Sequence, residues 1–247
     1  MEKMKTSIEG FVKISTDGMA DPIHIQFPTT ADQLSSVLGG IGRTYNKGDD
    51  FTFDYYICPT VPMLQGELPN PVRLDELNYL AHLIIDLDPE RSKLFDGLVD
   101  IGFGSSNGDY TMQSLINLRR NLGKFALYTG FDDCITNNQA DIRMGKIIAL
   151  ENGLPEAFMP FFDRYQYCQT LLRTGELRRC THGYIQDLGH VYHEHYKGYI
   201  RPYHKDIDLW HDAGDRQSLG LPPSRDTLST GGPKRAAKKP RTGDRGR

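Results

Sequence analysis

The sequence lacks any long hydrophobic run. Its longest apolar stretches, around Leu77–Ile85 and Ile147–Leu150, are short or interrupted, whereas a membrane-spanning helix needs about 18–20 apolar residues. The first residues, MEKMKTSIEGF, include lysines but no apolar stretch of about 7–15 residues, so we expect no secretory signal peptide. These absences predict a cytoplasmic protein without a membrane partner.

Cysteine is also scarce. The four cysteines, Cys58, Cys134, Cys168 and Cys180, are far apart and form no C-x-x-C pair. We therefore expect reduced and mostly buried thiols, as is usual in the cytosol. The 247 residues are 38% hydrophobic and 25% charged, a composition typical of a globular protein with a sizeable core.

The formal net charge of −3 hides an uneven distribution. Residues 215–247 contain nine basic and three acidic residues, a net charge of +6, whereas residues 1–214 carry −9. The tail is rich in glycine, proline and serine from residue 218 onward, so we expect disorder there. Its basic residues either bind nucleic acid non-specifically or form a solvated tail without a specific role; they include Lys234, Arg235, Lys238, Lys239 and Arg241.

The pattern of apolar residues predicts an α+β protein with an N-terminal part built on a small antiparallel sheet; the resemblance given below implies that it is elongated. The first part is rich in strands with one helix, the second is helical, the third mixes both types, and the fourth is the disordered tail. Their expected bounds are 1–70, 71–123, 124–214 and 215–247. The loop after residue 58 contains Pro59, Pro62, Pro69 and Pro71, which mark the first boundary.

Individual elements follow from local signals. Thr30 is placed to cap the first helix, and Asp88 with Pro89 is typical of a helix start. Gly123 is expected to close the helix over 115–122. Expected strands span 7–14, 23–27, 51–58, 125–128, 183–196 and 198–203, and expected helices span 31–38, 74–85, 89–102, 115–122, 142–150 and 156–172. The apolar face of the last helix would contain Phe158, Phe161, Phe162, Tyr165 and Leu172.

One stretch matches the G-x-S-x-G pattern of a serine nucleophile: Gly104-Ser105-Ser106-Asn107-Gly108. That chemistry needs a strand before the serine and a helix after it. Here the preceding segment is predicted to be a helix, which favours a polar loop between two helices. The loop also lacks the lysine of a phosphate-binding P-loop.

Histidines are concentrated near the end of the acidic body. Six of the eight follow residue 180: His182, His190, His193, His195, His204 and His211. His193 and His195 would share one face of a strand and could bind one metal ion. No H-E-x-x-H pattern accompanies them, so the alternative is a half-exposed aromatic sheet. We expect no metal and no cofactor.

Acidic residues on the predicted helices suggest a different kind of site. Asp86 and Glu90 flank a helix junction, and Asp96 and Asp100 are four residues apart on one helix. Four residues of helix rise about 6 Å, and successive phosphates of one DNA strand advance about 6.8 Å. Such carboxylates could imitate phosphates, although an ordinary acidic solvent face is the alternative.

The body of the chain, roughly residues 23–208, resembles the ArdA antirestriction proteins of conjugative plasmids and transposons. The strongest similarity lies in residues 74–81 (LDELNYLA) and 115–122 (LINLRRNL). Looser similarity covers residues 27–30, 53–56, 163–165 and 181–185. The two strong motifs look like core leucines with packing asparagines, so we do not assign their apolar and asparagine residues to partner contact.

The resemblance implies a dimeric, three-domain DNA mimic that is not an enzyme. Such a protein occupies the DNA groove of a type I restriction–modification enzyme and protects an incoming mobile element. We expect the mimic surface in the first two-thirds of the chain, on Asp75, Glu76, Asp86, Asp88, Glu90, Asp96, Asp100, Asp132 and Asp133. The alternatives are a nucleic-acid-binding accessory protein that acts through its tail, or an enzyme at Ser106 or at the histidines.

Overall fold

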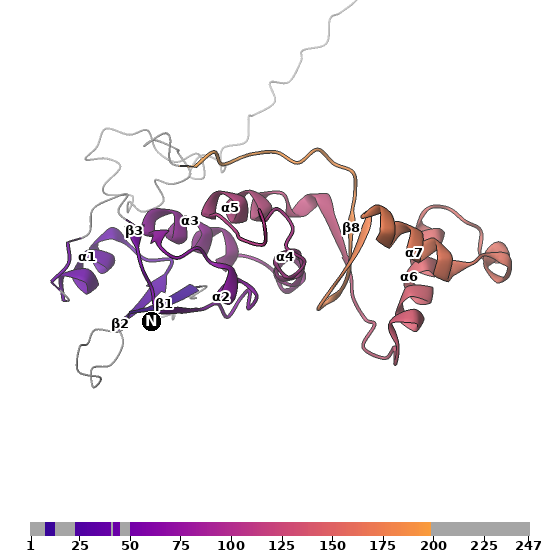
Figure 1. Cartoon of the computed structure of the whole chain (residues 1–247), viewed down its shortest axis with the longest axis horizontal. Helices are drawn as coiled ribbons and strands as arrows, with labels where there is room; N and C mark the ends of the chain where they lie inside the picture. Colours follow the sequence, from indigo (N-terminus) through magenta and orange to yellow (C-terminus); the bar gives the residue numbers. More distant parts are fainter. Residues whose placement is uncertain (1–7, 13–22, 41, 45–49, 199–247) are drawn as a thin grey trace, which may run out of the picture. The chain divides into compact units, whose positions relative to one another are not determined.

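The computed structural model describes residues 8–12, 23–40, 42–44 and 50–198. These residues form helices and small antiparallel sheets (Figure 1), which confirms the predicted α+β class. The predicted tail and all but the first residue of the predicted strand 198–203 lie outside them. No helix in the described part is long and apolar enough to cross a membrane.

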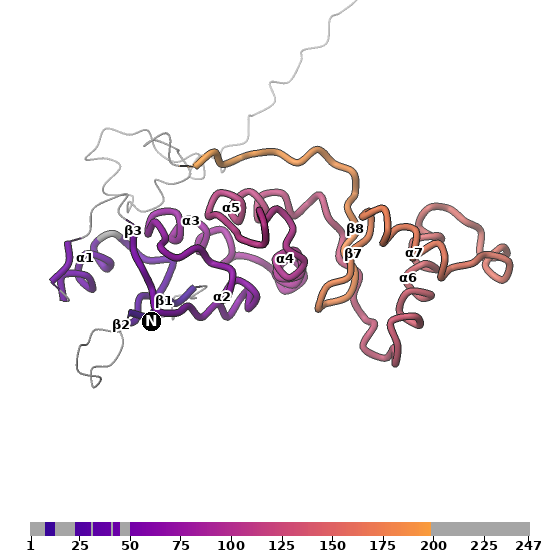
Figure 2. The backbone as a smooth tube through the Cα atoms, viewed as in Figure 1, coloured from indigo at the N-terminus to yellow at the C-terminus, as the bar shows by residue number. Residues whose placement is uncertain are grey.

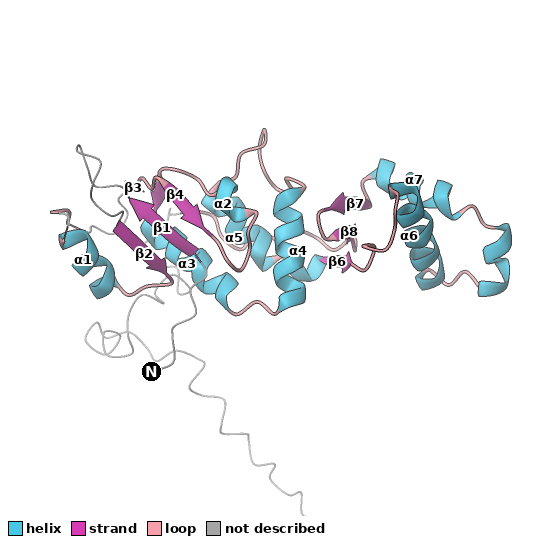
Figure 3. Cartoon of the chain, turned by 90° about the horizontal axis from the view of Figure 1, so that it is seen from below, coloured by secondary structure: helices cyan, strands magenta, loops and turns pink. Residues whose placement is uncertain are grey.

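The first sheet contains β1 (Ile8–Val12), β2 (Ile23–Phe27) and β4 (Tyr55–Ile57) in the order β2-β1-β4 (Figure 3). Gly10 sits at its centre, opposite Ile25 and Tyr56. A Cβ on Gly10 would lie 2.3 Å from the ring of Phe53, so only glycine lets this ring cover the sheet. Helix α1 (Ala31–Gly39) follows, and Thr30 caps it as predicted, within a capping box.

The predicted strand 51–58 is wrong as a single strand. Its start, β3 (Asp50–Phe51), pairs with β5 (Val72–Arg73) in a separate two-stranded sheet, whereas its end is β4. Between them the backbone of Phe53 is bonded by the side chain of Asn70, at 3.1 Å to its N–H and 2.6 Å to its C=O. The Asn70 side chain thus makes the bonds that Phe53 would otherwise make to a neighbouring strand. The alternation of residue types in 51–58 gives no sign of this replacement.

Five helices follow, and three of them correspond to the helices predicted over 74–85, 89–102 and 115–122. They are α2 (Leu64–Glu67), α3 (Leu74–Ile85), α4 (Pro89–Asp100), α5 (Met112–Arg120) and a short 3-10 helix (Leu122–Lys124). The last begins one residue after the cap of α5, so the helix predicted over 115–122 ends earlier than expected. Asp88 caps α4 as predicted, accepting the Arg91 N–H at 2.8 Å.

One cluster of buried side chains runs from Ile8 to Leu122 and includes Phe125, Ile185 and Tyr196. The predicted parts 1–70 and 71–123 therefore share a core, and their division into separate domains stays a prediction. All four cysteines are free, and Cys58 and Cys168 are buried.

The remaining described elements build a second, smaller core. Strands β6 (Phe125–Tyr128), β7 (Leu177–Cys180) and β8 (Gly183–Asp187) form a sheet in the order β6-β8-β7, and helices α6 (Asn137–Glu151) and α7 (Arg164–Thr174) pack together. Gly145 allows that packing, since a Cβ there would lie 2.0 Å from the carbonyl oxygen of Arg164. The buried cluster contains Ala140, Met144, Ile148, Cys168, Leu171, Leu177 and Tyr184.

Three expectations for this region are wrong. Helix α6 starts five residues before the predicted 142. The predicted helix 156–172 is a 3-10 helix (Glu156–Phe161) followed by α7, whose new start is capped by Asp163. Phe158 and Phe161 are 58% and 88% exposed, so they form no apolar face.

The predicted strand 183–196 ends at Asp187. Residues 188–198 continue as an extended segment that pairs with no strand of the described part of the chain, drawn in orange in Figure 2. This segment passes along α5, to which it is hydrogen-bonded. Its anchor is Tyr196, which is 1% exposed.

Candidate functional site

Three of the nine carboxylates predicted to form the acidic surface are buried. Asp75, Asp96 and Glu76 are 1%, 4% and 8% exposed, so their assignment to that surface is wrong. The other six residues are exposed: Asp86, Asp88, Glu90, Asp100, Asp132 and Asp133. The predicted basic residues of the tail, Lys234 to Arg241, lie outside the described residues.

Asp96 and Asp100, whose carboxylates were predicted to imitate phosphates, instead form hydrogen bonds within the chain. Asp96 Oδ2 lies 2.7 Å from His182 Nε2, and its Oδ1 accepts the Met63 N–H at 2.8 Å. Asp100 Oδ2 accepts both the N–H and the hydroxyl of Thr181, at 2.8 and 2.7 Å. The two carboxylates thus hold the β7–β8 turn against α4, and a partner would have to displace these bonds.

Glu76 and Asp75 are likewise occupied at the start of α3. Glu76 Oε1 accepts the hydroxyl of Tyr196 at 2.6 Å, and Asp75 Oδ1 lies 3.4 Å from Arg73 Nε. Burial raises the pKa of Glu76, although the hydrogen bond from Tyr196 lowers it in part. Tyr196 is 120 residues away in sequence, so the local acidic pattern gave no sign of this burial.

Replacing Glu76 with glutamine is expected to flatten the pH dependence of stability. Because the folded pKa lies above the usual 4.5, protonation stabilises the fold below pH 4.5, and this contribution is lost as the pH rises through the folded pKa. Each unit of difference corresponds to about 1.4 kcal/mol. Urea unfolding from pH 4 to 7 should show the wild type losing stability relative to Glu76→Gln, which still accepts from Tyr196.

The exposed Glu156→Gln serves as the control for this comparison. Its profile should stay parallel to that of the wild type, because Glu156 side-chain exposure is 82%. Parallel profiles for Glu76→Gln as well would contradict the assigned role of burial.

Four asparagines hold backbone segments through both atoms of their amides. Asn78 bonds the N–H and C=O of Thr29, at 2.7 and 3.0 Å. Asn117 bonds Tyr196 in the same way, at 2.7 and 2.6 Å. Asn121 bonds His193, and Asn70 bonds Phe53. We call these four contacts the asparagine clamps.

The clamps confirm the expectation for the two strong motifs. Asn78 lies in LDELNYLA, and Asn117 and Asn121 lie in LINLRRNL. All three are buried. They pack in the core, as predicted, and they also position distant segments, which the sequence did not indicate.

The exposed carboxylates that remain gather mainly at the junction of α3 and α4. Asp86, Asp88 and Glu90 are all exposed there. Arg91 Nε lies 3.6 Å from Asp88, and Arg119 Nε donates to the carbonyl of Leu83 at 2.7 Å. The junction therefore carries three exposed carboxylates with arginine side chains close to them.

The pKa of Arg119 reflects the positive and negative charges at this junction. Burial lowers its pKa, and the positive charges of Arg91 and Arg120 lower it further. Asp86 and Asp88 act in the opposite direction and raise it. Farther along the chain, Asp132 and Asp133 are exposed in the loop before α6, and Asp133 pairs with Arg143 at 2.6 Å.

A buried carboxylate network was missed by the sequence analysis. Asp141 is 0% exposed and accepts two bonds from Arg179, at 3.1 and 2.5 Å. Tyr184 and Gln169 also donate to it, each at 2.7 Å. The available signal was spacing, because Asp141 falls on the apolar stripe that continues with Met144 and Ile148. The network links α6, α7, β7 and β8.

The candidate catalytic residue Ser106 lies in a loop, and the candidate metal ligands His193 and His195 lie on the extended segment. Ser106 lies in the loop between α4 and α5 and pairs through its backbone with Asp109, so the predicted polar loop is confirmed. The rings of His193 and His195 lie 5.7 Å apart on the extended segment, not on a strand. Among the described residues, no group of three or more histidine, cysteine or acidic side chains could hold a metal ion.

Comparison with protein-family models, with curated proteins and with solved structures finds no match to this chain.

Proposed function

We propose that this chain is an antirestriction protein that mimics DNA, of the ArdA type, and that it inhibits a type I restriction–modification enzyme. The proposal is carried by the resemblance of residues 74–81 and 115–122 to that family. These residues form α3 and the end of α5 with its following turn, and α3 and α5 pack against each other. In this proposal the protein is an elongated cytoplasmic homodimer that carries out no chemical step.

The net negative charge of residues 1–214 supports the proposal, with fewer surface carboxylates than the sequence predicted. A nuclease that binds DNA gains affinity when ions around the phosphates are released, and carboxylates can supply the same charge. Residues 1–214 carry a net charge of −9. The proposed contact surface consists of the exposed carboxylates at the α3–α4 junction, Asp86, Asp88 and Glu90, together with Asp132 and Asp133.

The purified chain is expected to inhibit DNA cleavage by a type I restriction enzyme at low salt and less at high salt. The variant Asp86→Asn, Asp88→Asn, Glu90→Gln should inhibit at least about tenfold less, which corresponds to a loss of 1.4 kcal/mol in binding. Asparagine at position 88 is a good helix cap, so α4 should remain intact. Cleavage assays at several protein and salt concentrations measure the effect.

A matched control removes three other exposed carboxylates, with Glu151, Glu156 and Glu176 replaced by glutamine. This control should inhibit as the wild type does. If the full chain neither binds the enzyme nor slows cleavage at low salt, the proposed function is wrong.

The basic tail favours a second candidate function, non-specific binding to nucleic acid. Its net charge of +6 favours non-specific binding to nucleic acid. In that case the chain would shift duplex DNA in a gel without any restriction enzyme, and the three substitutions at the α3–α4 junction would not weaken the shift.

A further inference from the structure

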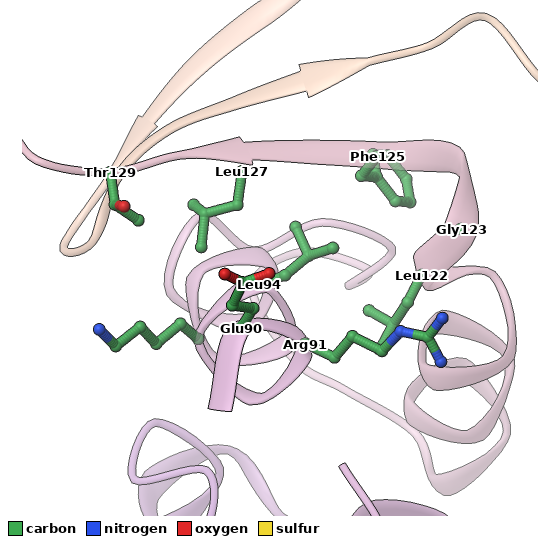
Figure 4. A pocket seen from close by; sticks show the side chains of 9 residues that line it. Glu90, Arg91, Leu94, Leu122, Gly123, Phe125, Leu127 and Thr129 are labelled. Carbon is green, nitrogen blue, oxygen red and sulfur yellow. The ribbon is translucent and has the colours of Figure 1, made fainter. Parts of the chain in front are cut away.

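A cavity of about 450 Å³ lies between α4 and β6 (Figure 4). Its apolar lining comes from Leu94 on α4, Leu122 before the sheet, and Phe125 and Leu127 on β6. The lining is completed by the charged residues Glu90, Arg91 and Lys93 and by Gly123 and Thr129, all of them exposed. Its volume is within the range of about 300–1,000 Å³ that is usual for ligand sites.

The cavity opens beside a sheet edge that no other described strand pairs with. In the order β6-β8-β7, strand β6 is an outer strand. The Leu188 N–H donates to Lys124 O at 3.0 Å, and the Asp187 N–H donates away from β6, to Glu176 O at 3.0 Å. Because bonded and non-bonded pairs alternate in an antiparallel ladder, Ala126 and Tyr128 are the residues of β6 that bond β8.

The same alternation directs the backbone of Leu127 away from β8. Phe125 shares this orientation, and its N–H accordingly bonds Leu122 O rather than β8. The side chains of Phe125 and Leu127 meanwhile line the cavity. The open edge of the strand and the apolar cavity are therefore presented by the same residues.

The charge around the opening is mainly positive. Arg91 and Lys93 line it from α4, and Lys124 immediately precedes β6, against the carboxylates of Glu90, which lines the cavity, and of Asp88, which lies 3.6 Å from Arg91 Nε. The Arg91 side chain is 68% exposed, and Figure 4 shows its guanidinium toward the end of the cavity formed by Leu122 and Gly123. This positive charge contrasts with the acidic character of the rest of residues 1–214.

We infer that the edge of β6 binds an extended segment of a partner protein in which an apolar residue is flanked, two positions away on each side, by acidic residues. Side chains two residues apart in a strand lie on one face, about 6.6–6.8 Å apart. The apolar side chain fills the cavity, and the flanking carboxylates lie near Arg91 and Lys93. The segment's backbone bonds Leu127, as in other complexes formed by strand addition.

This inference does not rest on the proposed function. The two sites share Glu90, which lines the cavity and also belongs to the proposed mimic surface. The cleavage assay measures inhibition of a restriction enzyme and the experiment below measures binding of a peptide, so the two can fail independently.

The test uses the full chain and the blocked peptide TDTLTDT, with TKTLTKT as the charge-reversed peptide. TDTLTDT should bind and should slow hydrogen exchange of the Leu127 amide, while the Ala126 amide, already bonded to β8, should change little. The variant Arg91→Glu, Lys93→Glu should bind TDTLTDT at least about tenfold more weakly and should gain affinity for TKTLTKT. Calorimetric titration and amide exchange followed by NMR give the two measurements.

Two further variants sharpen the result. Arg173→Glu, an exposed charge reversal on α7, should bind TDTLTDT as the wild type does. Leu127→Pro removes the outward N–H and should abolish binding, and proline is tolerated on edge strands. If Leu127→Pro does not fold, the charge-reversed pair still decides the question.

Three outcomes would overturn the inference. The first is equal binding of the two peptides, and the second is an unchanged exchange rate at Leu127 in the bound state. The third is a concentration-dependent dimer that the peptide does not dissociate and that Arg91→Glu, Lys93→Glu abolishes, because the edge would then pair with a second copy of the chain.

Discussion

Asp141→Ala is expected to lower the free energy of unfolding by about 3 kcal/mol. The substitution removes the acceptor shared by Arg179, Tyr184 and Gln169. Breaking a buried ion pair costs about 3–5 kcal/mol when the remaining charge stays buried. The Arg179 side chain is 44% exposed, so water can solvate part of its charge and the expected cost lies at the lower end. Urea unfolding measures the effect.

Two comparison variants identify the cause of that loss. Asp141→Asn keeps one acceptor oxygen and should cost less than Asp141→Ala. Asp132→Ala changes an exposed carboxylate and should stay within about 0.5 kcal/mol of the wild type. An Asp141→Ala variant as stable as Asp132→Ala would show that the network does not hold the second core together.

Asn117→Ala is expected to cost about 2–4 kcal/mol and to loosen Tyr196 from α5. It removes the two bonds of Asn117 to the N–H and C=O of Tyr196, a residue that is 1% exposed. Each buried backbone group left unsatisfied costs about 1–3 kcal/mol. Unfolding gives the energy, and faster hydrogen exchange at the Tyr196 amide reports the release.

The control for this variant is Asn138→Ala, at an exposed position in the first turn of α6. It should leave both measurements nearly unchanged. If the Tyr196 amide exchanges at the wild-type rate in Asn117→Ala, then the remaining contacts of the segment, among them the Tyr196–Glu76 bond and the Asn121 clamp, would be enough to hold it.

Local signals predicted the starts of three of the six expected helices correctly, those of α1, α3 and α4. Thr30 and Asp88 act through atoms within three residues of themselves, so their capping role is visible in the sequence. The division of 156–172 was missed because Pro160 lies inside a short 3-10 helix and Asp163 restarts the chain as a second cap. The apolar spacing of this region resembled one continuous helix, but it did not show which aromatic residues would find a core.

The acidic site shows where sequence reasoning stops. A carboxylate on a helix surface and a carboxylate under a distant segment look alike in sequence. Asp96 is buried by His182, 86 residues later, and Glu76 by Tyr196. Asp86 and Glu90 are exposed, as a surface role requires, because both lie next to the turn between two helices.

The asparagine clamps bear on how this chain can diverge. A carboxamide that grips main-chain atoms does not recognise the side chain of the residue it holds. Thr29 and His193 can therefore be exchanged for other residues without loss of the grip, whereas Asn78 and Asn121 cannot. We expect distant homologues to conserve the clamp asparagines while the residues they bond vary. A few scattered asparagines would then remain conserved where the surrounding sequence is no longer similar.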